Sequence, residues 1–129
     1  MIINIFAQNI VEISQNSFGN YAIQHALDLW KFNKCKPIFE ELLKNFVKLA
    51  SQRYSSKVAE KLILDSDIDS LTRVVEVLED ENKLLGLLTS KFGNFVLNKL
   101  MTKVKGGELL HKLEAGIAEA TKKIKQVHS

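Results

Sequence analysis

The chain has 129 residues, of which 46% are hydrophobic, 26% charged and 8% aromatic. This composition is typical of a globular domain and excludes a disordered or collagen-like chain. The length suits one domain, and a single proline and six glycines are too few for a turn-rich β-sandwich. Long helices are therefore the favoured secondary structure.

The formal net charge is +3, but the charges are unevenly distributed. Residues 65–82 contain seven acidic side chains and one basic side chain, and basic residues predominate on both sides of this segment. The pattern indicates opposed charged faces or edges rather than one uniform nucleic-acid-binding surface. A solvated helical surface would give the same pattern.

Cellular location and membrane contact are addressed by three features of the sequence. Cys35 is the single cysteine, which excludes both a disulfide framework and a zinc site made of cysteines. The apolar opening, residues 1–11, has neither a basic start nor a small-residue cleavage site, so we expect no signal peptide. No apolar run approaches the roughly 18 residues of a membrane span. We therefore expect a soluble, cytoplasmic protein without a membrane partner.

Helical periodicity dominates the chain, and no stretch alternates with the period of two that a strand requires. Residues 37–50 place apolar side chains on one broad helical face. Residues 67–79 repeat the pattern after the polar residues 65–67, which offer helix caps. Residues 107–127 repeat it once more. The sequence predicts an all-α chain.

Three segments align with one another without gaps and indicate an internal repeat. They are residues 16–27, 52–63 and 90–101, which begin 36 and 38 residues apart. Each contains an aromatic residue, a small residue and a polar residue in succession, and a second polar residue follows four positions after the first. A helical period of this length is typical of an α-solenoid, in which neighbouring units complete one another's core.

The polar residues of the repeats form three triads. Residues i and i+4 lie above one another on a helical face, and residue i+1 lies beside them. If the repeats stack in parallel, the triads line one concave surface and form three stations. Each station has two hydrogen-bonding side chains and one flat or long side chain. The stations are Asn20/Tyr21/Gln24, Ser56/Lys57/Glu60 and Asn94/Phe95/Asn98.

Such stations suit the reading of single-stranded RNA. A base presents donors and acceptors along its edge and flat faces that stack on aromatic or cationic side chains. The amides of Asn20 and Gln24 both donate and accept, which matches the carbonyls and the N3–H group of uracil. The ionised carboxylate of Glu60 only accepts, and it fits the two adjacent donors of guanine, N1–H and the N2 amine.

These residues also carry a resemblance to a known family. The run from Phe18 to His25 resembles the core of the Pumilio (PUF) repeat, and the run from Ser56 to Glu60 resembles its guanine-reading form. The resemblance covers essentially the whole chain, as the last three repeats of such a protein. It implies a right-handed α-solenoid of about three repeats, closed by residues 107–127 as a C-terminal capping helix.

The resemblance also implies how RNA is read, with one base per repeat on a strand antiparallel to the repeats. The implied element is 5′-U-G-U, with the first uracil at Asn94/Asn98, guanine at Ser56/Glu60 and the second uracil at Asn20/Gln24. The implied role is post-transcriptional regulation through mRNA untranslated regions, together with protein co-regulators. Two positions depart from the family pattern. Asn98 replaces the usual glutamine, and Lys57 replaces a flat or amide stacking residue.

Two other functions remain open from the sequence. One is a protein-binding scaffold of the HEAT or armadillo type, on which the polar stripe is incidental. The other is a PUF-related protein that binds RNA with little sequence preference during ribosome assembly. Three matched triads in one register favour sequence-specific RNA binding over both.

No catalytic or metal site is expected. The histidines, His25, His111 and His128, are far apart and lack metal-ligand spacing. Cys35 has no evident base beside it. The sequence shows no nucleophile with its base and no carboxylate pair set for catalysis. We therefore expect a protein that is not an enzyme and uses no cofactor.

The remaining aromatic and apolar residues give two further expectations. An aromatic column precedes the repeated helices on a face different from that of the triads, and we expect its members, Phe18, Tyr54 and Phe92, to be core wedges. Tyr21 and Phe95 are then the base-stacking residues. Residues 1–14 carry an apolar face with no preceding repeat to cover it, which predicts self-association through this end or a longer array.

Overall fold

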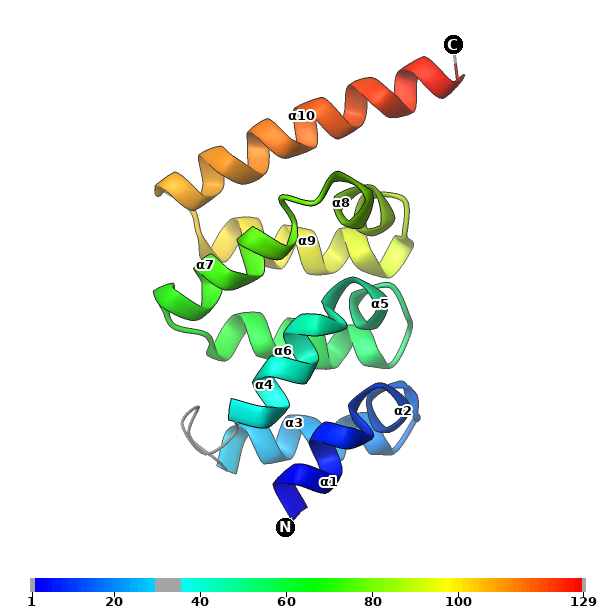
Figure 1. Ribbon diagram of the computed structural model, residues 1–129, viewed down its shortest axis with the longest axis vertical. Helices are drawn as coiled ribbons and strands as arrows, with labels where there is room; N and C mark the ends of the chain where they lie inside the picture. The colour runs from blue at the N-terminus through cyan, green and yellow to red at the C-terminus, as the bar shows by residue number, and fades with distance from the viewer. Residues whose placement is uncertain (1, 30–35, 129) are drawn as a thin grey trace.

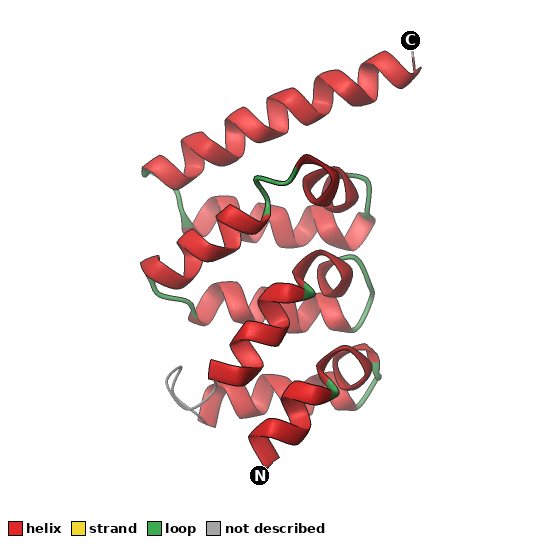
Figure 2. Cartoon of the chain, viewed as in Figure 1, coloured by secondary structure: helices red, strands yellow, loops and turns green. Residues whose placement is uncertain are grey.

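The computed structural model describes residues 2–29 and 36–128, and within them it contains ten helices and no strand (Figures 1 and 2). The predicted all-α class is confirmed. Cys35, beside which the sequence shows no evident base, lies outside the described residues. No helix in the described part of the chain combines the length and the apolar character that crossing a membrane requires.

Nine of these helices form three units of three, and the tenth follows them (Figure 1). In chain order they are α1 (Ile2–Gln8), α2 (Ile10–Gln15), α3 (Gly19–Leu29), α4 (Lys36–Lys44), α5 (Phe46–Ala50), α6 (Ser55–Asp65), α7 (Ile68–Val77), α8 (Glu81–Leu88), α9 (Lys91–Lys103) and α10 (Glu108–His128). The segments predicted as repeat cores fall on α3, α6 and α9.

The units stack along the long axis of the molecule (Figure 1). Helices α3, α6 and α9 form one layer, the inner layer, in which α6 packs against both of its neighbours. Helices α1, α4 and α7 lie in front of this layer in the view of Figure 1, and α2, α5 and α8 lie along one edge. This arrangement is the predicted α-solenoid.

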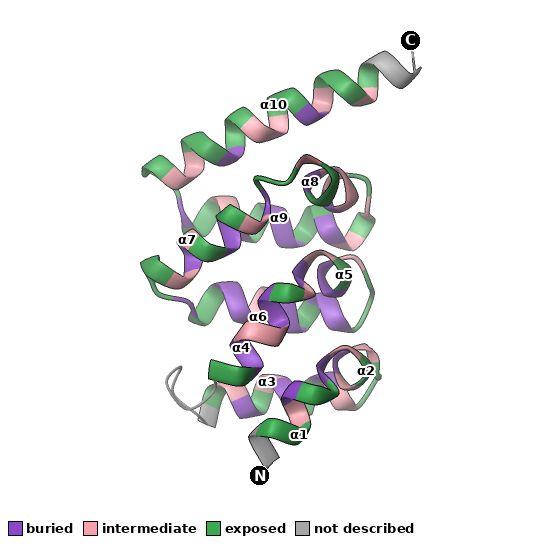
Figure 3. Cartoon of the chain, in the orientation of Figure 1, coloured by how far each residue is buried: buried purple, intermediate pink, exposed green. Residues whose placement is uncertain are grey.

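The tenth helix closes the end of the stack. It packs on α8 and α7, with Leu113 and Ala120 buried against them. Its other face is exposed along most of its length (Figure 3). The turn before it passes through Gly106, whose φ of +84° is a left-handed conformation that glycine adopts without steric cost. The expectation of a capping helix near residues 107–127 agrees with this placement.

The small residue near the start of each inner helix lies against the backbone of the residue six positions earlier. A Cβ atom built on Gly93 would lie 2.4 Å from the carbonyl oxygen of Leu87, and Gly19 has an equally close backbone neighbour. In the second unit the corresponding residue is Ser55, whose Oγ donates a hydrogen bond to the Leu49 carbonyl at 2.7 Å. The small residue of the repeat therefore allows the inner helix to approach the helix before it.

The prediction of one helix over residues 37–50 is wrong, because the structure divides it at Asn45 into α4 and α5. Asn45 has φ −107° and ψ 17°, and its Nδ2 donates to the Glu41 carbonyl at 2.8 Å. Asn9 does the same between α1 and α2, where its Nδ2 donates to the Ile5 carbonyl at 2.9 Å. Such side-chain bonds to the backbone compete with the helical ladder and bend the chain.

The segment predicted over residues 67–79 is observed as α7, with Asp67 as its N-cap. The carboxylate of Asp67 accepts a hydrogen bond from the Ser70 backbone N–H at 2.8 Å. This bond lowers the pKa of Asp67 below its ordinary value.

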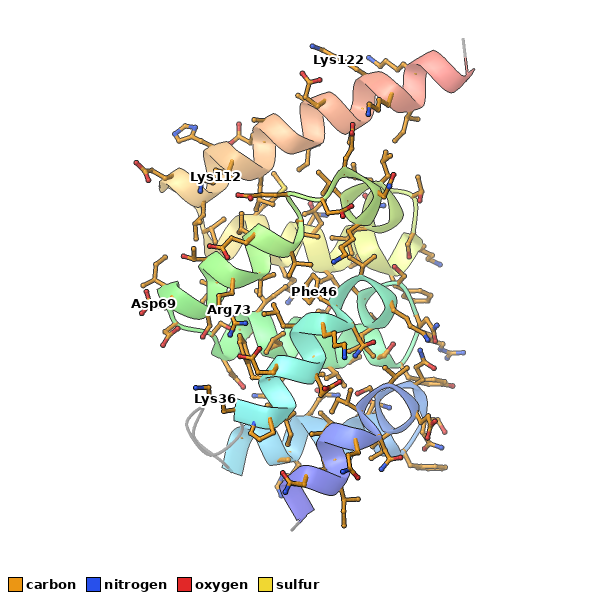
Figure 4. The ribbon with its side chains drawn as sticks, in the orientation of Figure 1. Lys36, Phe46, Asp69, Arg73, Lys112 and Lys122 are labelled. Atoms are coloured by element: carbon orange, nitrogen blue, oxygen red, sulfur yellow. The ribbon has the colours of Figure 1, made fainter. Side chains whose placement is uncertain are left out.

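The acidic segment of residues 65–82 runs from the end of α6 through α7 into the start of α8, and cations from neighbouring helices pair with part of it. Lys112 and Lys123 of α10 pair with Glu79 at 3.8 Å and with Glu81 at 2.5 Å. Arg73, within the segment, points toward α4 (Figure 4) and binds both carboxylate oxygens of Glu40, at 2.5 and 2.9 Å. This hydrogen bonding lowers the pKa of Glu40 and raises that of Arg73. These ion pairs thus join the second unit to the third and the third unit to α10.

Candidate nucleic-acid interface

All nine predicted site residues lie on the inner layer, with three on each of its helices. The relative positions i, i+1 and i+4 are kept on α3, α6 and α9. The structure brings five of the nine together in a groove between α6 and α9 with a volume of about 790 Å³. These five are Ser56, Lys57, Glu60, Phe95 and Asn98. Asn94 and the three residues of α3 do not line this groove.

The α6–α9 groove also has residues that the triads did not reveal. Four cationic side chains and one carboxylate line it, so its net charge is positive. The cations are Arg53, Lys57, Lys99 and Lys103, and the carboxylate is that of Glu60. A positively charged groove of this kind suits the phosphates of a nucleic-acid strand.

Two of the missed cations also contribute to the structure. The guanidinium of Arg53 lies over the ring of Tyr54, 5.2 Å from its centroid. Nζ of Lys103 donates to the Leu64 carbonyl at 2.9 Å, in the last turn of α6. A cation at that position satisfies a free carbonyl and opposes the negative end of the helix dipole.

A sequence signal for Lys99 exists in the residue that directly follows each triad. This residue is basic in all three repeats, as His25, Lys61 and Lys99. Lys61 serves a different purpose from Lys99, because it pairs with Asp28 of α3 and with Asp65 at 3.2 Å. The hydrogen bond with Asp28 is the main cause that raises the pKa of Lys61. This position therefore joins two units in one case and lines the groove in another.

At the α3 station the first polar side chain is already hydrogen-bonded. Asn20 is only 2% exposed, and its Nδ2 donates to the carbonyls of Asn16 at 2.8 Å and Ser17 at 3.1 Å. Its Oδ1 accepts a hydrogen bond from Nε2 of Gln24 at 3.1 Å. Gln24 is half-buried and retains its Oε1 and one N–H for a ligand.

At the α6 station the free polar atoms are acceptors. Ser56 is 3% exposed, and its Oγ donates to the Arg53 carbonyl at 3.0 Å, which commits its only proton. The side chain of Glu60 is 17% exposed, and its Oε2 lies 3.8 Å from Nζ of Lys57. Lys57 itself is exposed beside them.

At the α9 station the two polar side chains are independent of one another. Nδ2 of Asn94 donates to the carbonyls of Leu88 at 2.6 Å and Ser90 at 2.8 Å. The Asn98 amide is exposed and makes no side-chain hydrogen bond with the residues that the structure describes. The first polar residue of every triad thus donates to one or two backbone carbonyls that lie three to six residues earlier.

The expectation that the aromatic column would form core wedges is wrong for Phe18 and Tyr54. Phe18 is 84% exposed, and Tyr54 is exposed beneath Arg53. Phe92 is half-buried and lines the α6–α9 groove. Phe92, the second residue of α9, is thus the member of the column that faces the neighbouring unit.

The two predicted stacking aromatics, Tyr21 and Phe95, are both exposed, so their rings are accessible to a base. His25 and His111 are exposed on separate helices, and the side chain of His128 lies outside those that the structure describes. Within the described residues, no three His, Cys, Asp or Glu side chains are grouped to hold a metal ion.

Comparison with known proteins gives both sequence relatives and structural neighbours. Pumilio homolog 12 of Arabidopsis thaliana is 29% identical over 105 residues, which cover 81% of this chain and 18% of the relative. Pumilio homolog 18 of the same plant is 31% identical over 101 residues, which cover 78% of this chain and 31% of the relative. The chain therefore spans less than a third of the length of these relatives.

Solved structures agree with the observed fold. The crystal structure of PUF-8 in complex with PBE-RNA has a TM-score of 0.83 at 20% identity, and the match covers 97% of this chain and 37% of that one. The Puf3 RNA-binding domain, bound to a Cox17 RNA 3′ UTR recognition sequence, has a TM-score of 0.70 at 21% identity, with 99% and 44% covered. Residues 9–43 and 45–78 match the family model of the Pumilio-family RNA-binding repeat. The chain belongs to the Pumilio (PUF) family.

Proposed function

We propose that the chain binds single-stranded RNA along the inner layer and reads 5′-U-G-U, one base per station from α9 to α3. Membership of a family of RNA-binding repeats supports this proposal, as do the RNA complexes of PUF-8 and Puf3. The positive α6–α9 groove adds an electrostatic argument. The observation that carries the proposal is that Ser56 and Glu60 of the α6 station offer only acceptors.

At that station, guanine is the base with the best match. The proton of Ser56 Oγ is committed to the Arg53 carbonyl, and the carboxylate of Glu60 only accepts. Guanine presents two adjacent donors on its Watson–Crick edge, whereas adenine, cytosine and uracil each place an acceptor beside a single donor group. An acceptor held against a carboxylate leaves both groups without a partner, which is costly in a partly buried groove.

The side chains at i+1 supply the remaining contacts. Tyr21 and Phe95 are exposed rings beside the outer two stations and provide faces for stacking. Lys57 takes this place at the middle station and adds a positive charge beside the strand. Each stacked base contributes about 1–3 kcal/mol, so three bases give micromolar or weaker binding for these three stations alone.

The test compares RNA hexamers that contain U-G-U or U-A-U in the same flanking sequence, titrated against the parent and Glu60→Gln. We expect the parent to favour guanine and Glu60→Gln to lose most of that preference, because its amide donates as well as accepts. Glu114→Gln on the exposed face of α10 is the matched control and retains the preference. Circular dichroism should show the same helix content in all three proteins. Equal affinity of the parent for the two RNAs would overturn the proposal.

The biological role that we propose is post-transcriptional regulation of mRNA in the cytoplasm through untranslated regions, with protein co-regulators. The 3′ UTR sequence in the Puf3 complex supports this class of target. Crosslinking of the protein to RNA in cells, followed by sequencing, tests it. Enrichment of U-G-U elements in 3′ untranslated regions is the expected result. Enrichment of ribosomal RNA precursors would instead favour the role in ribosome assembly.

A further inference from the structure

The α3 and α9 stations differ in how their second polar side chain is held. In α3 the amide of Gln24 is bonded to Asn20, whereas in α9 the amide of Asn98 has no such bond to Asn94. We propose that the α9 station accepts adenine and cytosine as well as uracil, and that the α3 station distinguishes uracil from both. This inference rests on the proposed reading of one RNA base per station.

The orientation of the Gln24 amide follows from the backbone of the preceding turn. Two carbonyls, of Asn16 and Ser17, accept from Nδ2 of Asn20, so the Asn20 amide can be placed only one way round. Its Oδ1 consequently faces Gln24, which must present Nε2 to it. Rotation of the Gln24 amide by half a turn would bring two oxygens together and lose the bond. Oε1 of Gln24 is therefore held on the side away from Asn20.

In α9 the backbone fixes the first amide, that of Asn94, but the second amide, that of Asn98, is not held by the first. The carbonyls of Leu88 and Ser90 fix the amide of Asn94, which leaves its Oδ1 as an acceptor. The side chain of Asn98 is one methylene shorter than that of glutamine, and its amide does not bond to Asn94. The exposed Asn98 amide is free to present its donor and its acceptor in either order.

The order of donor and acceptor on the amide matters because bases differ in the order of the groups along their Watson–Crick edge. Along the Watson–Crick edge from the same side, uracil presents an acceptor and then a donor, O4 and N3–H. Adenine and cytosine present a donor and then an acceptor, the exocyclic amine followed by N1 or N3. The strand direction fixes the side from which each edge is read. An amide held one way round pairs with one order, whereas an amide that rotates pairs with both.

The test uses RNA hexamers that differ only at the base before the guanine or only at the base after it. For the parent, we expect uracil, adenine and cytosine before the guanine to bind within about threefold of one another, since a free amide forms equivalent hydrogen bonds to each. Asn98→Gln should restore the bond to Asn94 and favour uracil there by about tenfold, the value of one hydrogen bond near 1.4 kcal/mol. Gln24→Asn should make the opposite change and relax the choice of the base after the guanine.

Each outcome separates this inference from the function on which it rests. A parent that prefers guanine in the middle but also strongly prefers uracil before it would overturn the inference and leave the proposed function standing. A parent without any preference for guanine would overturn the proposed function. A second measurement needs no RNA: ¹⁵N relaxation of the side-chain amides in the free protein should show Gln24 to be more rigid than Asn98. Equal rigidity would overturn the inference.

Discussion

Gly93, in the first turn of α9, lies against the backbone of Leu87, and a Cβ atom added there would lie 2.4 Å from the Leu87 carbonyl oxygen. A backbone atom cannot swing aside as a side chain does, so an added methyl group requires α8 and α9 to separate. The same relationship recurs at Gly19, and Ser55 resolves it with a hydrogen bond.

We predict that Gly93→Ala destabilises the protein by about 1–3 kcal/mol, the usual cost of forcing a methyl group into a filled space. Gly86→Ala in α8 is the matched control, because its Cβ would lie 3.4 Å from a Val47 methyl group, an ordinary contact. Alanine there should leave stability unchanged or raise it by up to about 1 kcal/mol through helix propensity. Urea denaturation of the three proteins provides the measurement. Equal stability of Gly93→Ala and the parent would contradict the close packing of Gly93 against the Leu87 backbone.

A second prediction concerns the pH dependence of stability at Asp67. Its hydrogen bond from Ser70 lowers the pKa of the folded state below the ordinary value of 3.8. The contribution of the ionised cap is therefore fully present above pH 3.8 and is lost as the pH falls through the folded pKa. Asp67→Asn retains a capping side chain without a titrating proton. The stability difference between the parent and this variant should be constant at neutral pH and should change in acid.

Thermal denaturation of the parent and Asp67→Asn across the acid range measures this difference. Both proteins lose stability in acid through their other carboxylates, so the informative quantity is the gap between them. A gap that stays constant through the most acidic samples would show that Asp67 is not a charged cap in the folded state.

A third prediction separates affinity from base choice in the α6–α9 groove. Lys99 lines the groove, and its position suits a phosphate contact. Lys99→Ala should weaken binding to all RNA hexamers alike and reduce the slope of log affinity against log salt by about 0.7, the value for one phosphate of a single strand. Lys125→Ala on α10, which is exposed and outside the groove, should change neither quantity. A changed base preference in Lys99→Ala would contradict a purely electrostatic role.

The fold was predictable where apolar spacing and repetition coincide. The period between the repeats and the spacing of the triads predict three stacked inner helices, and the structure contains them. The bend at Asn45 was not predicted, because the apolar residues keep helical spacing across it. Its counterpart Asn9 lies 36 residues earlier, so the repeat itself contained a signal for this bend.

The candidate site was predictable in its register but not in its hydrogen bonding. Helical geometry places Asn20 and Gln24 on one face, and the structure agrees. The carbonyl partners of Asn20 and Ser56 are local, three and four residues earlier in the chain. The near-complete burial of these two residues was not predictable, because burial depends on how neighbouring helices pack. The exposure of Phe18 has the same origin, since an aromatic residue before a helix can face either of two units. Self-association through residues 1–14 stays a prediction.

The small residue at the start of each inner helix has a consequence for protein engineering. This residue packs against, or donates to, the backbone carbonyl six residues before it. Each such pair should therefore be moved together when units are exchanged, as the blocks of residues 13–20, 49–56 and 87–94. Splice points are better placed after an inner helix, for example between Ser66 and Asp67, where α6 has ended and α7 has not begun.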